Sequence, residues 1–126
     1  MPAALLTALA PAFLAQASVA APPITDLAQL PVTEATAPSC AIAFALVGQW
    51  QKAGEARGQA WPDMATSGAR EFFVQAIAQL MDARGLDRPA VQGMVARESE
   101  RLQAAGDARI AAMMPACLSI KQAAGL

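Results

Sequence analysis

The two cysteines, Cys40 and Cys117, are the residues of this chain whose chemistry is clearest. They are too far apart in the sequence to form a CxxC redox pair or a close-spaced metal motif. In an exported chain, such a pair is typical of one structural disulfide. A crosslink that closes so long a loop stabilises a protein by about 4 kcal/mol in the chain-entropy model. We therefore predict a disulfide between Cys40 and Cys117; the alternatives are two free buried thiols, or a redox or metal role.

Met113 and Met114 place soft sulfur atoms close to Cys117, on adjacent turns of a predicted helix. Copper(I) prefers ligands of this type. Methionine is also the ordinary filler of irregular helical cores, and a cysteine held in a disulfide is not available to a metal. We interpret both methionines as core residues and predict no metal site.

Most familiar catalytic chemistry is excluded by the residue types that the sequence lacks. It contains no histidine, which rules out Ser-His and Cys-His triads and the common zinc hydrolase sites. None of the ten acidic residues has a context that marks an acid–base dyad, and the eight glycines fit no phosphate-binding loop. A net charge of −1 gives no reason to expect a nucleic-acid partner. We therefore expect a protein that is not an enzyme, takes no cofactor and acts by binding.

Three aromatic residues are candidate contacts for a partner protein or a small apolar ligand: Trp61, Phe72 and Phe73. Phe72 and Phe73 belong, with Ile77, to a helical pattern for which core packing is the usual explanation. Trp61 precedes Pro62 in a glycine-rich segment, where a tryptophan either closes over the core as a lid or stands exposed as a partner contact. We favour the lid.

The beginning of the chain has the pattern of an export signal. Every charged residue lies at or after Asp26, and the preceding stretch is apolar and ends in small residues. This predicts a signal peptide over residues 1–20, although no Lys or Arg precedes the apolar run; the alternative is a retained N-terminal helix. The run is shorter than a membrane helix requires. We expect a periplasmic or secreted protein with no stable membrane anchor after cleavage.

Between the signal peptide and the folded domain, residues 21–38 contain four prolines and no sustained period. Proline removes a backbone donor and restricts the residue before it. These residues are therefore predicted to form an extended leader. A docked strand or a short helix around residues 24–30 is the alternative.

The remaining chain, residues 39–126, has helical periodicity and no convincing alternation of the strand type. The predicted class is all-α: a small four-helix bundle whose first and last helices are joined by the disulfide. Ser39 is expected to cap the first helix, and Pro115 to kink or split the last one. The predicted helices cover residues 40–54, 69–81, 88–105 and a last segment from 107.

The corner between the second and third predicted helices has the most complete set of signals. Gly85 can adopt the left-handed conformation that ends a helix. Asp87 can cap the next helix, and Leu86 between them can pack against both helices. Together these residues predict an αα-hairpin.

The third predicted helix carries a band of charged residues: Arg97, Glu98, Glu100 and Arg101. Opposite charges three positions apart interact on a helix surface with a few tenths of a kcal/mol at most. We interpret the band as a solvated face.

A signal peptide, a small helical domain and one cysteine near each end of that domain resemble the layout of periplasmic acid-stress chaperones of the HdeA type. The resemblance is one of architecture, without a shared motif: those proteins are rich in lysine, whereas this chain is rich in alanine. No residue role is therefore carried over. Three hypotheses follow: an exported protein that binds an unknown protein partner, a holdase chaperone opened by acid, or a carrier of a small apolar ligand.

Overall fold

The computed structural model describes residues 22–126. Within this range the protein is all-helical, with four α-helices and no strand, which confirms the predicted class. The predicted signal peptide, residues 1–20, lies outside the described residues. The helices are α1 (Val32–Lys52), α2 (Ala69–Arg84), α3 (Arg88–Ala105) and α4 (Asp107–Ala123), with short 3-10 turns η1 (Leu27–Gln29) and η2 (Ala56–Gly58).

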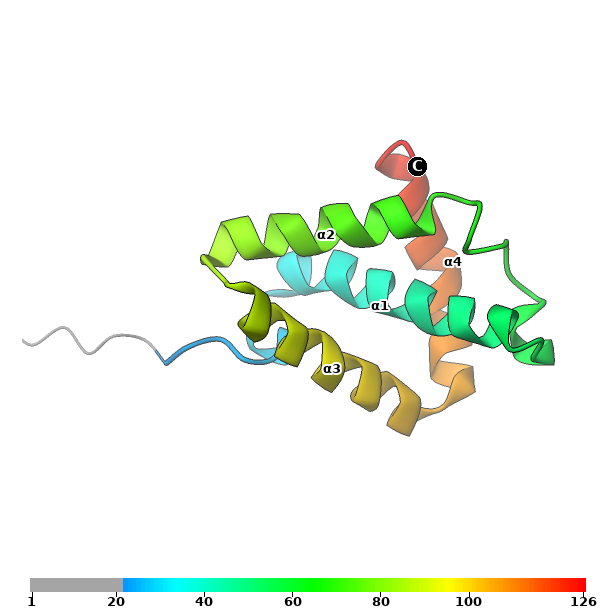
Figure 1. The fold of residues 1–126 in the computed structure, drawn as a ribbon, viewed down its shortest axis with the longest axis horizontal. Coiled ribbons are helices and arrows are strands. Elements are labelled where there is room, and N and C mark those ends of the chain that lie inside the picture. The colour runs from blue at the N-terminus through cyan, green and yellow to red at the C-terminus, as the bar shows by residue number, and fades with distance from the viewer. Residues whose placement is uncertain (1–21) are drawn as a thin grey trace, which may run out of the picture.

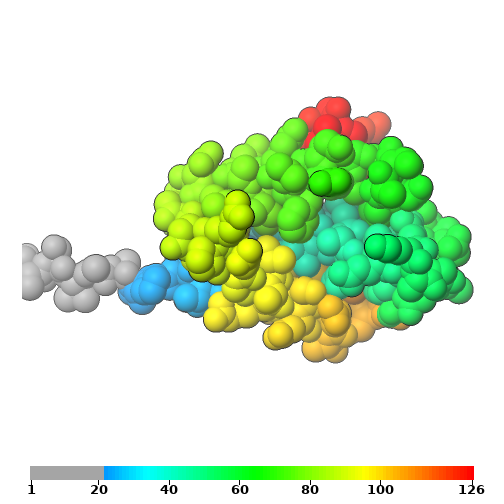
Figure 2. Space-filling model, in the orientation of Figure 1, coloured from blue at the N-terminus to red at the C-terminus, as the bar shows by residue number. Residues whose placement is uncertain are grey.

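Helix α1 lies at the centre of the molecule, and α2, α3 and α4 all pack against it (Figure 1). The sequence explains this position, because α1 is apolar on almost every side and a helix of that kind must be contacted from several directions. Ile42, Phe44 and Val47 are each at most 2% exposed. In the space-filling view, side chains of α2 and α3 flank the visible part of α1 (Figure 2).

Helix α1 begins earlier than predicted. It starts at Val32 and includes Pro38, whereas the expected start was Cys40 with Ser39 as its cap. Pro38 has no N–H to donate to the carbonyl of Glu34, so one intrahelical hydrogen bond is missing. The side chain of Pro38 is buried. Tertiary packing therefore overrides the local proline signal, and the second half of the predicted leader is helical.

The first half of the predicted leader docks on the domain through η1. Asp26 caps this turn by accepting a hydrogen bond from the backbone of Ala28, and the Gln29 side chain accepts one in return from the backbone of Asp26. Leu27 and Leu30 are 3% and 7% exposed. The alternative of a docked short helix in this segment is thus the observed one.

The turn predicted between α2 and α3, with its glycine and its capping aspartate, is confirmed. Gly85 has φ of 61°, and the Leu86 N–H donates to the carbonyl of Met81 over 3.0 Å. Asp87 caps α3 by accepting a hydrogen bond from the Ala90 N–H over 2.9 Å. A left-handed glycine and a capping aspartate act locally, so sequence alone identifies this corner.

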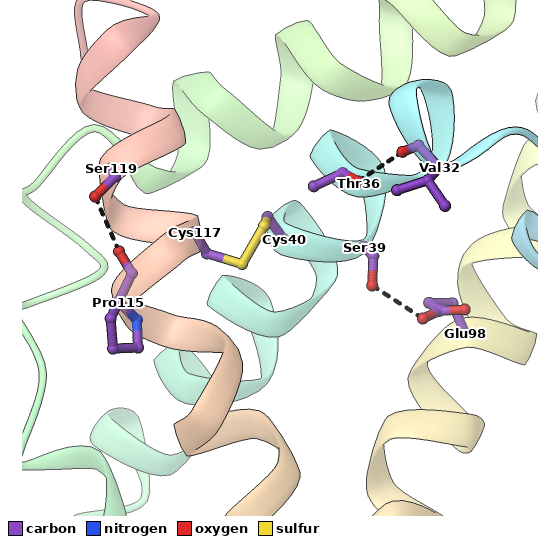
Figure 3. Close-up of a disulfide and its surroundings, with 8 residues drawn as sticks. All are labelled: Val32, Thr36, Ser39, Cys40, Glu98, Pro115, Cys117 and Ser119. Carbon is purple, nitrogen blue, oxygen red and sulfur yellow. Dashed lines mark hydrogen bonds between the residues drawn. A yellow bond between two sulfur atoms is a disulfide. The ribbon is translucent and has the colours of Figure 1, made fainter.

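Helix α4 contains Pro115 without being split by it (Figure 3). The Ser119 hydroxyl donates a hydrogen bond to the Pro115 carbonyl within the same helix. Of the two outcomes predicted for Pro115, division into two segments is therefore wrong. The helix crosses behind α1 in the view of Figure 1 and brings its central part against the first half of α1.

Candidate functional site

The predicted disulfide is present and joins α1 to α4 (Figure 3). The Cα atoms of Cys40 and Cys117 are 5.2 Å apart, and both residues are 2% exposed. Neither cysteine is free, so neither sulfur is available as a nucleophile or as a thiolate ligand. Met114 is fully buried and Met113 half-buried, as expected of core residues. The pair therefore functions as a crosslink between the first and last helices.

Within residues 22–126, no group of three or more Cys, Asp or Glu side chains is placed to hold a metal ion. No helix in this range is both long enough and apolar enough to cross a membrane.

A polar network holds the docked segment against α3. The Glu98 carboxylate accepts a hydrogen bond from the Ser39 hydroxyl at 3.0 Å (Figure 3). It also accepts one from Arg101. Arg101 also forms an ion pair with Asp26, and Arg97 donates to the carbonyl of Thr25. The Ala28 N–H, and secondarily Arg101, lower the pKa of Asp26 below its ordinary value.

This network corrects the interpretation of the charged band as a solvated face, because Glu98 is only 6% exposed. Its buried position could have been found from the sequence. Glu98 lies seven residues after Val91 and four after Met94, on the same side of the helix as those two buried residues. The band therefore has one member on the inner face of α3.

A cleft with an apolar lining and a volume of about 530 Å³ lies between α1, α2 and the loop that joins them. We call it the α1–α2 cleft. The part of its lining that comes from α1 includes three small residues at helical spacing, Ala41, Ala45 and Gly48. Its lining is Ala41, Phe44, Ala45, Gly48, Gln51, Lys52, Asp63, Met64, Ala65, Ala69, Arg70 and Phe73.

One wall of the cleft is the loop of residues 53–68, and Gln51 fixes this loop in place. The Gln51 Nε2 donates to the carbonyls of Gly58 and Pro62, at 3.0 and 2.8 Å. Its Oε1 accepts from the Met64 N–H at 2.9 Å. A Cβ on Gly58 would lie 2.9 Å from the backbone nitrogen of Gln51, so only glycine allows this close approach.

The far end of the same loop is fixed by α4. The buried Lys121 donates from Nζ to the carbonyl of Ser67. Next to it, Gly68 has φ of 82° and directs the chain into α2. Gly68 occupies the N-cap position of α2, so no side chain caps this helix.

The three predicted contact residues occupy different places. Phe73 is half-buried and lines the cleft. Phe72 is 4% exposed and meets Phe44 edge-on in the core, with ring centroids 5.5 Å apart. Trp61 is half-buried against the core, and its carbonyl accepts from Gln51. The sequence analysis missed the small residues of α1, although their helical spacing was a usable signal.

Charged side chains lie only at the margin of the cleft lining: Lys52 from α1, Asp63 from the loop and Arg70 from α2. All three are exposed. The Asp63 carboxylate accepts hydrogen bonds from the Ala65 N–H and the Thr66 hydroxyl, so it is bound within its own loop. The cleft thus combines an apolar interior with a margin that carries two cations and one internally bonded acid.

Within residues 22–126, the fold and the site define a small disulfide-linked helical domain with an apolar cleft between α1 and α2. Comparison with known proteins adds no relative: no family model, no curated protein and no solved structure matches this chain. The function of this chain can therefore be inferred only from the geometry of the cleft.

Proposed function

We propose that this chain is a small exported binding protein that holds an apolar small molecule in the α1–α2 cleft. The observation that carries the proposal is the cleft itself. Its volume of about 530 Å³ falls within the roughly 300–1,000 Å³ typical of small-molecule sites. Its interior is formed by alanine, glycine, methionine and phenylalanine side chains, a lining that favours binding through apolar contact.

The way the cleft is held open supports binding rather than a packing defect. Gln51 fixes the loop wall through hydrogen bonds to three of its backbone groups at 2.8–3.0 Å. Phe44 and Phe72 fix the base through their edge-on contact. A site that needs little ordering on binding retains more of its contact energy as affinity.

The proposal places the protein outside the cytoplasm, in the periplasm or secreted. A disulfide and the absence of a membrane-spanning helix within residues 22–126 are compatible with an oxidising compartment. The expected signal peptide over residues 1–20 supplies the route. The intact mass of the protein from its native host, measured with and without reduction before alkylation, tests this. A full-length mass with two freely alkylated cysteines would contradict export.

Binding in the cleft can be tested with the neutral apolar fluorophore N-phenyl-1-naphthylamine, whose emission rises in an apolar site. Wild-type protein should enhance its fluorescence saturably at one probe per chain. Ala45→Phe places a ring in the cleft from an exposed position of α1 and should abolish the enhancement. Ala78→Phe, at an exposed position of α2 outside the cleft lining, is the matched control and should bind normally.

Circular dichroism should show that both variants retain the helical fold, because both positions are solvent-exposed. The proposal fails if wild-type protein gives no saturable enhancement. It fails equally if Ala45→Phe binds the probe as well as Ala78→Phe does.

A second candidate function is an acid-opened holdase, favoured by the carboxylates that hold the docked segment. Asp26 and Glu98 both bind Arg101, and Leu27 and Leu30 are buried beside them. Protonation of Asp26, whose pKa the fold lowers, would break its ion pair with Arg101, release the segment and expose apolar surface. The test is suppression of aggregation of an unfolded client at pH 2–3, and no suppression at that pH removes this candidate.

A further inference from the structure

The two cations in the lining of the α1–α2 cleft, Lys52 and Arg70, take part in no ion pair, and the same holds elsewhere among the described residues for Arg88, Arg97, Arg109 and Lys121. Among residues 22–126, neither Lys52 nor Arg70 has a carboxylate oxygen within the 4.0 Å that defines an ion pair, whereas Arg57, Arg84 and Arg101 all do. The one acid in the lining is Asp63, and its oxygens accept hydrogen bonds within its own loop. The lining therefore carries two positive charges and one negative charge, so its charged margin is positive on balance.

The two cations come from different walls. Lys52 is the last residue of α1, and Arg70 is the second residue of α2. The first turn of α2 also has no side-chain cap, so its backbone N–H groups and the positive end of its dipole add to the positive potential at Arg70. Lys52, in contrast, stands at the negative end of the α1 dipole. An anion at this margin would be met from both sides.

We propose that the ligand of the cleft is an anionic amphiphile: an alkyl or aryl body in the apolar interior and one acidic headgroup between Lys52 and Arg70. This inference rests on the proposed binding function and specifies its ligand class. The apolar interior recognises the body without directional contacts. The two cations select the acid over a neutral or cationic compound with the same body, since electrostatic complementarity determines specificity more than total affinity.

The experiment compares three ligands that share one decyl chain: decanoate, decanol and decyltrimethylammonium. Each ligand is titrated into full-length wild-type protein loaded with N-phenyl-1-naphthylamine at pH 7, and displacement of the probe is measured. The ligand concentration stays below the value at which that ligand forms micelles. Decanoate should displace the probe at the lowest concentration and decyltrimethylammonium at the highest. Raising the salt concentration should weaken the binding of decanoate and leave the binding of decanol unchanged.

Variants assign the selectivity to the two cations. Lys52→Gln and Arg70→Gln should each lower the affinity for decanoate by about fivefold, the upper range for a solvent-exposed ion pair. The affinity for decanol should not change. Arg109→Gln removes an exposed cation of α4 that lies outside the cleft lining, and it should leave all three ligands unchanged. All three positions are exposed, so the variants should fold.

Failure of this inference can be separated from failure of the binding function. If the probe binds the cleft but decanoate and decanol displace it equally, the ligand class is overturned and the binding function stands. If wild-type protein does not bind the probe, both are overturned. Co-sedimentation with phosphatidylglycerol vesicles without displacement by decanoate would also overturn the inference, in favour of a membrane surface as the anion.

Discussion

Removal of the crosslink between Cys40 and Cys117 is expected to lower the free energy of unfolding by about 4.5 kcal/mol at 25 °C. The two cysteines are 77 positions apart. Opening a loop of that length returns about 15 cal/mol/K of chain entropy to the unfolded state. Domains of this size have total stabilities of roughly 5–15 kcal/mol, so the reduced protein should be marginally stable.

The assay is urea unfolding of three forms of the protein: oxidised, reduced, and Cys40→Ala/Cys117→Ala. Trp50, which is 7% exposed, reports on the core by fluorescence, and circular dichroism reports on the helices. The difference between oxidised and reduced protein measures the crosslink alone. The difference between reduced protein and the double variant measures the lost packing of two buried sulfur atoms.

The reduced form should also show a larger denaturant slope, because its unfolded chain is more expanded and exposes more surface. The reasoning is refuted if oxidised and reduced protein differ by less than about 1 kcal/mol with equal slopes. Such a result would mean that the unfolded state is already compact when the bond is broken.

Three further changes test local features of the structure. Asp87→Ala removes the α3 cap and should cost about 1 kcal/mol in urea unfolding, whereas Asp87→Ser should cost less because serine also caps. Gln51→Ala removes four hydrogen bonds to the loop wall, one of them long, and should cost about 2–3 kcal/mol; unchanged probe binding would show that the wall does not need Gln51. The folded pKa of Asp26 is below its ordinary value of 3.8, so its stabilising contribution is present above that value and is lost as pH falls through the lower folded pKa. Asp26→Asn should therefore lower stability at pH 7 and flatten the decline in acid, measured as thermal unfolding against pH.

The features that sequence predicted well are those that depend on a few neighbouring residues. The corner around Gly85 and Asp87 needs only a left-handed glycine and a capping carboxylate, and both act within one turn. The bounds of α3 follow from Asp87 on one side and Gly106 on the other. The disulfide was predictable because two cysteines allow only one pairing within the chain.

The features that sequence missed depend on contacts between distant segments. Local rules predicted that α1 begins only after Pro38. The burial of that proline outweighs the one missing hydrogen bond, so the helix begins at Val32. Glu98 was assigned to a solvated band, although its partners Ser39 and Arg101 make its burial acceptable. A charged residue on an apolar stripe is a signal for such a network.

The α1–α2 cleft is also a feature that the sequence did not predict. A sequence pattern identifies large apolar residues that fill a core, whereas a cleft forms where distant segments leave space beside small residues. Large residues fill the sides of α1 toward its other neighbours, as Ile42, Leu46 and Val47 are all at most 3% exposed. Ala45, in contrast, is exposed in the middle of the helix on the side of the cleft. A leucine there would fill the space, and protein interiors normally close such gaps. Small residues on one side of a central helix, beside a loop that Gln51 of the same helix holds in a fixed position, are what the proposed ligand site requires.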